Sequence, residues 1–132
     1  MSCCPTPTMM SREELGRRIA QIALLQGTFT LRSGRTSNYY LDKYLFSTVP
    51  EILSQIGIGL ASRIFHVKTE LGVAIDRLAG AELGGIPLVT VASLQTGLPC
   101  VFIRQQKKDH GTGKQIEGVL KEGDRVVLIE DV

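Results

Sequence analysis

The sequence predicts an α/β protein whose parallel-sheet core follows an N-terminal helix and a β-hairpin. From about residue 70 onward, apolar strand-like segments alternate with a helical segment. That order is typical of a parallel sheet with right-handed crossover connections. Helix-start signals occur near residues 11 and 50. Between them lie two short strand-like segments separated by a glycine-containing turn, which is the pattern of a hairpin.

The composition is that of an ordinary soluble globular domain. The 132 residues are 43% hydrophobic and 21% charged, with a net charge of +2, which fits one domain with one core. This charge argues against a protein that coats nucleic acid, but it allows local basic clusters that bind small anions. The cysteines (Cys3, Cys4 and Cys100) have neither disulfide-framework nor zinc spacing. No secretory signal and no apolar run of about 20 residues is found, so no membrane partner and a cytoplasmic location are expected.

The N-terminal part is expected to begin with a disordered leader, residues 1–10, followed by a folded domain over residues 11–132. Ser11 and Glu14 form a capping-box pattern, and apolar residues at helical spacing follow until Gly27. The elements expected next are strands at 28–32 and 38–43 around a turn at 33–37, and a helix from Pro50 to about residue 65. Gly57 and Gly59 weaken that helix, which indicates close packing against another element.

The C-terminal part is expected to form the sheet. The elements expected there are a strand at 73–78, a glycine-rich segment at 79–85, a helix that ends at Gly97, and strands at 100–104, 116–120 and 125–129. A polar basic loop joins the strands at 100–104 and 116–120, and a turn at 121–124 precedes the last strand. We find no internal repeat.

The last strand ends in two adjacent acids, Glu130 and Asp131. The carboxyl edge of a parallel sheet is where α/β proteins bind their ligands. Two carboxylates there can hold ribose hydroxyls or a hydrated Mg²⁺. Acids also end buried strands for purely structural reasons, so this motif alone is a weak indication of function.

Two further motifs are suited to phosphate. The loop at 104–114 gathers Arg104, Lys107, Lys108, His110 and Lys114, and such a loop can close over a pyrophosphate. It is not a P-loop, because the required glycine and Ser/Thr are absent. Glycines at 80–85 lie between a strand and a helix, where backbone amides can approach a phosphate. A solvated surface loop and a tight turn are the ordinary alternatives.

A fourth motif spans residues 29–40, Phe-Thr-Leu-Arg-Ser-Gly-Arg-Thr-Ser-Asn-Tyr-Tyr. Its arginines can pair with a carboxylate, and its aromatic rings can stack on a planar ring. A hairpin with aromatic core residues would give the same pattern.

Together and in this order, these motifs resemble those of orotate phosphoribosyltransferases. The resemblance runs from about residue 15 to residue 132 and includes Ala-Gly-Ala-Glu-Leu-Gly-Gly-Ile-Pro-Leu, Lys-Lys-Asp-His-Gly-Thr-Gly-Lys and Val-Val-Leu-Ile-Glu-Asp-Val. It implies a type I phosphoribosyltransferase fold. It also implies transfer of the 5-phosphoribosyl group from phosphoribosyl pyrophosphate to orotate, giving orotidine 5′-monophosphate and pyrophosphate, in pyrimidine (UMP) biosynthesis. A ribosyl-cation-like transition state, a requirement for Mg²⁺ and a homodimer follow from the same resemblance.

The resemblance also assigns roles to individual residues. Lys108, Asp109 and His110 match the catalytic loop, which in the family reaches into the neighbouring subunit's site. The residues matched to phosphoribosyl-pyrophosphate binding are Arg104, Gln105, Lys108, His110, Glu130, Asp131, Val132, Leu83 and Gly84. Those matched to positions near orotate are Arg32, Tyr40 and Leu41. The resemblance assigns no metal ligand to the protein, because Mg²⁺ is expected to arrive with the substrate.

The chain departs from the family at three positions and at its end. Gln105 stands where a second basic residue is frequent, Arg32 where lysine is frequent, and Gly84 where one branch has lysine. Beyond Glu-Asp-Val the family continues with a phosphate-binding loop and an arginine that grips orotate, so the resemblance implies a partial domain. A non-catalytic binding or regulatory protein, and an enzyme for a purine or another pyrimidine base, are the alternative interpretations.

Overall fold

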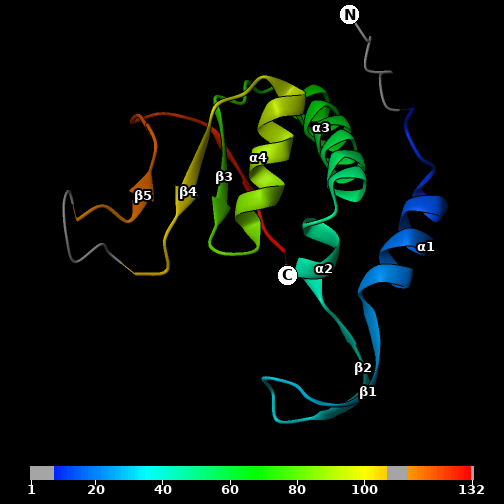
Figure 1. Cartoon of the computed structure of the whole chain (residues 1–132). Helices are drawn as coiled ribbons and strands as arrows, with labels where there is room; N and C mark the ends of the chain where they lie inside the picture. Colours follow the sequence, from blue (N-terminus) through cyan, green and yellow to red (C-terminus); the bar gives the residue numbers. More distant parts are fainter. Residues whose placement is uncertain (1–7, 107–112, 132) are drawn as a thin grey trace, which may run out of the picture.

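A computed structural model of the chain describes residues 8–106 and 113–131. A hairpin, a short helix and the first helix lie at one end, and a sheet with two packed helices forms the other part (Figure 1). The elements are α1 (Arg12–Ala23), β1 (Leu24–Thr30), β2 (Thr36–Leu41), α2 (Lys43–Ser47), α3 (Pro50–Leu71), β3 (Arg77–Ala81), α4 (Gly85–Thr96), β4 (Cys100–Ile103), β5 (Ile116–Glu117) and β6 (Val126–Ile129). The predicted α/β architecture is confirmed.

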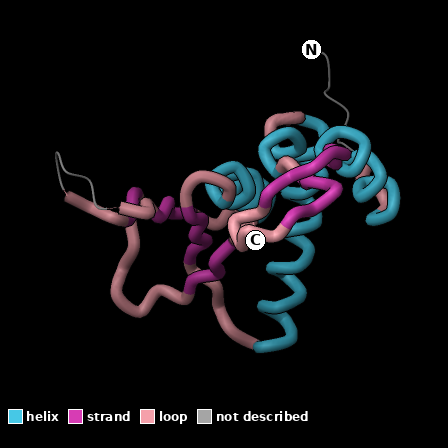
Figure 2. Tube along the Cα trace, turned by 90° about the horizontal axis from the view of Figure 1, so that it is seen from below, coloured by secondary structure: helices cyan, strands magenta, loops and turns pink. Residues whose placement is uncertain are grey.

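The main sheet has the strand order β5–β4–β3–β6. β3 pairs in parallel with both β4 and β6, while β5 pairs antiparallel with β4. In Figure 2 the strands of this sheet lie to one side and α3 and α4 to the other. Leu78 of β3, Val89 of α4, Ile64 of α3 and Ile129 of β6 are buried together in the core between them. Burial of these side chains is the main force that joins helices and sheet.

The first helix ends earlier than the sequence suggested. Ser11 caps it as predicted, its hydroxyl accepting a hydrogen bond from the backbone N–H of Glu14. The helix stops at Ala23, because the Ala23 carbonyl accepts from the backbone N–H of Asp42 and the chain turns into β1. Gly27 therefore does not end a helix. It lies inside β1 with φ 152°, at an irregularity in the hairpin register, where glycine is the favoured residue.

The helix that begins at Pro50 runs past the predicted end, residue 65, to Leu71. The polar stretch after residue 65 was not assigned to the helix, but it forms the last turns of α3, with an i,i+4 contact between His66 and Glu70. Gly72 ends the helix in the left-handed conformation at φ 60°, a conformation that glycine adopts without strain. Among the described residues, no helix has both the length and the hydropathy to cross a membrane.

The strands around the glycine-rich segment are shifted relative to the prediction. The strand expected at 73–78 is β3, and its last residues, Ala79–Ala81, come from the segment that was expected to be a turn. Glycine is needed at position 80 for the strand to continue, because a Cβ there would lie 2.5 Å from the Gly85 carbonyl oxygen. β4 and the helix end at Gly97 confirm the prediction, whereas β5 is only two residues long.

An ion pair joins β3 to the turn before β6, at the amino end of the sheet. Asp124 accepts from the Arg77 guanidinium and from the backbone N–H of Lys121. These hydrogen bonds, first that of Lys121 and then that of Arg77, hold the pKa of Asp124 below its ordinary value of 3.8. Because the pKa of Asp124 is lower in the folded state, the ionised carboxylate stabilises the fold at pH values above the unfolded-state pKa. This stabilisation is lost as the pH falls through the folded-state pKa.

We therefore expect Asp124→Asn to flatten the acid side of the stability profile. Wild type should lose stability below about pH 4, the region where an unfolded aspartate titrates. The variant should be less stable than wild type at pH 7. The difference in free energy of unfolding between the two should become smaller at acid pH. Urea unfolding at a series of pH values measures this, and Glu122→Gln in the same turn is the matched control. Parallel profiles for Asp124→Asn and wild type would contradict the assignment.

Candidate functional site

The predicted functional segments meet at the carboxyl edge of the main sheet. β3, β4 and β6 run in parallel, so the residues that follow them emerge on the same side. The glycine-containing turn follows β3, Arg104 follows β4, and Glu130 with Asp131 follows β6. In Figure 1 the C-terminal end of the chain lies at this edge, close to α2. The sequence prediction that the acids stand at a carboxyl edge is confirmed.

Asp131 is held between the turn after β3 and the first residue of α2. Lys43 Nζ lies 3.1 Å from Asp131 Oδ2 and donates to the Asp131 backbone carbonyl at 2.6 Å. On the other side, a Cβ at Gly84 would lie 1.8 Å from Asp131 Oδ2. Gly84 is buried, and the Asp131 side chain is 20% exposed. A glycine at position 84 is therefore required for the carboxylate to occupy this place.

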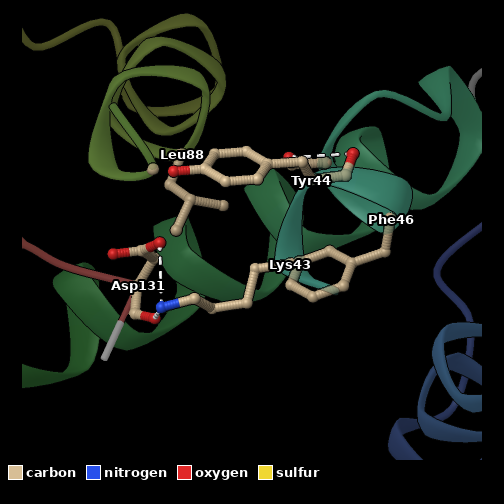
Figure 3. A pocket seen from close by; sticks show the side chains of 7 residues that line it. Lys43, Tyr44, Phe46, Leu88 and Asp131 are labelled. Atoms are coloured by element: carbon tan, nitrogen blue, oxygen red, sulfur yellow. Dashed lines mark hydrogen bonds and ion pairs between the residues drawn. The ribbon is translucent and has the colours of Figure 1, made fainter. Parts of the chain in front are cut away.

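A small pocket surrounds this ion pair (Figure 3). Its apolar wall comes from Leu88 of α4 and from Tyr44 and Phe46 of α2. Figure 3 shows the Lys43 side chain extended toward Asp131, with the Tyr44 ring beside Leu88. Because apolar side chains exclude water from part of its surroundings, the ion pair is stronger than a fully solvated one.

The turn after β3 is tied to the residues after β4. Glu82 Oε1 accepts from the backbone N–H of Gln105 at 2.6 Å, and the Gln105 amide approaches the Glu82 carbonyl at 3.4 Å. The peptide bond between Glu82 and Leu83 is cis, and the Leu83 side chain is 65% exposed. Gln105 thus contributes hydrogen bonds to the turn where a basic residue would contribute charge.

Arg104, the residue before Gln105, contacts β5 and the segment that precedes it. Its Nε is 2.9 Å from Glu117 Oε1 in β5, and its backbone N–H donates to the Gln115 carbonyl at 2.8 Å. Arg104, Glu117, the turn residues Glu82 and Leu83, and the end of β4 line a surface pocket of about 170 Å³. The Arg104 side chain is 38% exposed, so an anion in this pocket can reach it.

The hairpin extends beyond the carboxyl edge, with its turn on the same side as the C-terminal end of the chain (Figure 1). Arg32 lies in the turn and is exposed. Tyr40 and Leu41 in β2 are each 42% exposed. The Tyr40 ring packs against Phe29, with centroids 5.6 Å apart. The structure therefore gives the aromatic pair a packing role, while leaving Tyr40 and Leu41 accessible.

Comparison with known proteins shows which proteins the chain is similar to. No protein-family model matches the chain. The chain is 44% identical over 123 residues to the orotate phosphoribosyltransferase of Pyrococcus furiosus, and the match covers 92% of this chain and 65% of the relative. The chain is similar to orotate phosphoribosyltransferases over most of its length. It spans about 65% of that relative's length.

Solved structures of an orotate phosphoribosyltransferase and of a UMP synthase have a similar fold. The orotate phosphoribosyltransferase of Mycobacterium tuberculosis gives a TM-score of 0.67 at 26% identity, covering 89% of this chain and 65% of that one. The UMP synthase of Leishmania donovani gives 0.70 at 28% identity, covering 89% of this chain and 24% of that one. The type I phosphoribosyltransferase fold implied by the sequence is thus confirmed.

Several residues singled out by the resemblance to orotate phosphoribosyltransferases lie outside the described residues. These are Lys108, Asp109, His110 and Val132. Of the others, Leu83, Gly84, Arg104, Gln105 and Asp131 gather at the carboxyl edge. Glu130 follows β6 and is exposed, while Arg32, Tyr40 and Leu41 lie on the hairpin.

Sequence reasoning missed Lys43, Glu82 and Glu117. Lys43 was expected only as the end of a strand, and Glu82 only as part of a turn. Each contacts a residue from a distant segment: Asp131, Gln105 and Arg104, respectively. An isolated charge next to a strand end was the available signal in each case, and this signal is common in surface residues that have no function.

Proposed function

We propose that the chain carries out phosphoribosyl transfer to orotate, as part of pyrimidine (UMP) biosynthesis. In this reaction the bond between C1 of the ribosyl group and the pyrophosphate oxygen breaks, and a bond from C1 to a ring nitrogen of orotate forms. The observation that supports the proposal most strongly is the meeting of Asp131, Gly84 and Arg104 at one sheet edge. A phosphoribosyl substrate needs groups that accept hydrogen bonds from its hydroxyls, next to groups that donate hydrogen bonds to its anionic phosphates.

Within this proposal, each part of the edge has a role. Asp131 and Glu130 accept hydrogen bonds from the ribose hydroxyls. Arg104, Gln105 and the backbone around Leu83 and Gly84 bind the pyrophosphate. Stabilising pyrophosphate as it leaves, and holding the ring nitrogen in line, are the main contributions to rate in such a reaction. Lys108, Asp109 and His110 retain their proposed catalytic role on the basis of the family resemblance.

We place Mg²⁺ on the substrate's pyrophosphate. The donor set fits this, because Glu130 and Asp131 offer hard carboxylate oxygens beside the ribose position. When bound, the ion neutralises charge that develops on the departing pyrophosphate. The described residues contain no group of three or more His, Cys, Asp and Glu side chains placed to hold a metal.

The base is proposed to lie between the hairpin and the carboxyl edge. Arg32 can pair with the orotate carboxylate, and the exposed faces of Tyr40 and Leu41 can contact its ring. A carboxylate-free base such as adenine or uracil would lack the partner that Arg32 requires. This favours orotate over the alternative of a purine or another pyrimidine.

We further propose that the protein is a cytoplasmic homodimer. Large apolar side chains are exposed along the hairpin and α2, among them Leu24, Leu25, Tyr39 and Leu45. Exposed apolar side chains of this size are suited to a protein interface. Sedimentation equilibrium at micromolar concentration tests the proposal, and a monomer throughout would contradict it.

The activity itself is tested by pyrophosphate release from phosphoribosyl pyrophosphate in the presence of Mg²⁺. Release should depend on orotate, and orotidine 5′-monophosphate should form in equal amount. Uracil, adenine and hypoxanthine in place of orotate decide between the bases. If the protein binds phosphoribosyl pyrophosphate but gives no release with any base, the non-catalytic binding interpretation replaces the enzymatic one.

Substitution of Arg104 tests the pyrophosphate pocket. We expect Arg104→Met to raise the KM for phosphoribosyl pyrophosphate about tenfold, because one charge-assisted hydrogen bond to the anion is lost. The KM for orotate should change much less. Arg63→Met, at an exposed position of α3, is the matched control. Equal changes in both KM values would place Arg104 outside the pyrophosphate site.

A further inference from the structure

Lys43 connects the hairpin to the acids at the end of β6. It is the first residue of α2 and comes two residues after the end of β2. Its ammonium group contacts both the carboxylate and the backbone carbonyl of Asp131, 88 residues away in sequence. Two contacts from one ammonium group fix both the side chain and the course of the chain after β6.

The base of Lys43 is itself held in place. The preceding residue, Asp42, caps α2 by accepting from the backbone N–H of Tyr44 at 3.0 Å. The Asp42 backbone N–H donates to the Ala23 carbonyl at the end of α1. The backbone that carries Lys43 is thus bonded to both α1 and α2, so the ammonium group reaches Asp131 from a fixed point.

The contact leaves Asp131 able to bind a ligand. Lys43 Nζ and Gly84 both face Oδ2, and a Cβ at Gly84 would lie closer to Oδ2 than to Oδ1. A carboxylate oxygen accepts more than one hydrogen bond, and the two oxygens together accept about four. Oδ1 can therefore accept from a hydroxyl while Oδ2 stays with Lys43.

We infer that Lys43 is a positioning residue, which orients Asp131 toward the ribose hydroxyls and sets the distance between the ribose and base sites. This inference rests on the proposed function. Because Lys43 follows β2 so closely, its contact with Asp131 also fixes the hairpin residues Tyr40 and Leu41 relative to the sheet edge. Lys43 acts through Asp131 without itself touching the substrate.

The test compares Lys43→Met, Lys43→Arg and a control, Lys68→Met, at an exposed position of α3. Binding of phosphoribosyl pyrophosphate with Mg²⁺ is measured by titration calorimetry, and KM and kcat in the orotate-dependent assay. Lys43→Met should weaken binding and raise KM about tenfold, the effect of losing a partly exposed charged hydrogen bond, with a smaller change in kcat. Lys43→Arg should restore most of the affinity, since charge and reach are kept.

The outcomes separate this inference from the proposed function. If Lys43→Met and Lys68→Met bind phosphoribosyl pyrophosphate equally well, the inference is overturned while the activity stands. If wild type binds the compound without turnover, the proposed activity fails, and the calorimetric comparison still decides the role of Lys43. If wild type does not bind it at all, both are overturned. Circular dichroism of each variant confirms that the fold is intact.

Discussion

Gly84→Ala is expected to lower kcat/KM for phosphoribosyl pyrophosphate by about 100-fold, because a displacement of about 1 Å at a reacting site costs that much. The backbone at Gly84, with φ −66° and ψ −30°, suits any residue. The entire effect therefore comes from the new methyl group, which would lie 1.8 Å from Asp131 Oδ2 and 2.2 Å from its Cγ. Asp131 must move, and with it its contact with Lys43. Steady-state kinetics in the orotate-dependent assay measure the loss.

Gly59→Ala is the matched control for this substitution. Gly59 is exposed in the middle of α3, and a Cβ there would meet no described atom within 4 Å. The variant should keep full activity and gain up to about 1 kcal/mol of stability, since alanine is the better helix former. If Gly84→Ala kept wild-type kcat/KM, the carboxylate of Asp131 would have no part in binding the ribosyl group.

The sequence was sufficient to predict elements whose signals are local. Ser11 predicted the start of α1, Pro50 that of α3, and Gly97 the end of α4, because caps and proline act within one helical turn. The parallel sheet was predicted because an apolar strand, a helix and a second apolar strand in succession can pack in few other topologies. In each case the residues that decide the structure lie next to one another in the chain.

Predictions failed where a distant segment decides the outcome. α1 gives way to β1 at Leu24 because that residue pairs with Leu41 across the hairpin, and no pattern within α1 indicates the partner. The turns of α3 after residue 65 were left out of the predicted helix because they are polar and lack the apolar spacing that marks a buried helix face. β3 starts at Arg77, where the pairing with Val126 begins. Apolar content alone placed it four residues too early.

The same distinction holds for the site. The glycine turn, Arg104 and the acids after β6 were predicted because each forms a motif within a few residues. Lys43 could not be predicted, since its role depends on a contact with Asp131 that only the folded chain creates. The proposed site thus combines local motifs, which the sequence displays, with positioning contacts that do not form a pattern in the sequence.

Gly57→Ala is expected to destabilise the fold by about 1–3 kcal/mol, the usual cost of overpacking a core. A Cβ at Gly57 would lie 2.5 Å from Cγ2 and 3.2 Å from Cγ1 of Val91, across the contact between α3 and α4. Valine has few rotamers in a helix, so it cannot turn aside. Urea unfolding measures the change against Gly59→Ala in the same helix, which should be stabilising.

A double-mutant cycle with Val91→Ala identifies the cause. Val91→Ala alone should be destabilising, because it leaves space between the helices. In the double variant the new methyl group at position 57 partly fills that space, so the two losses should not add. A double variant more stable than the sum of the single losses supports direct contact as the reason for glycine at position 57. Strict additivity would mean that Gly57→Ala acts through the backbone of α3, and that the close packing of α3 on α4 does not depend on this glycine.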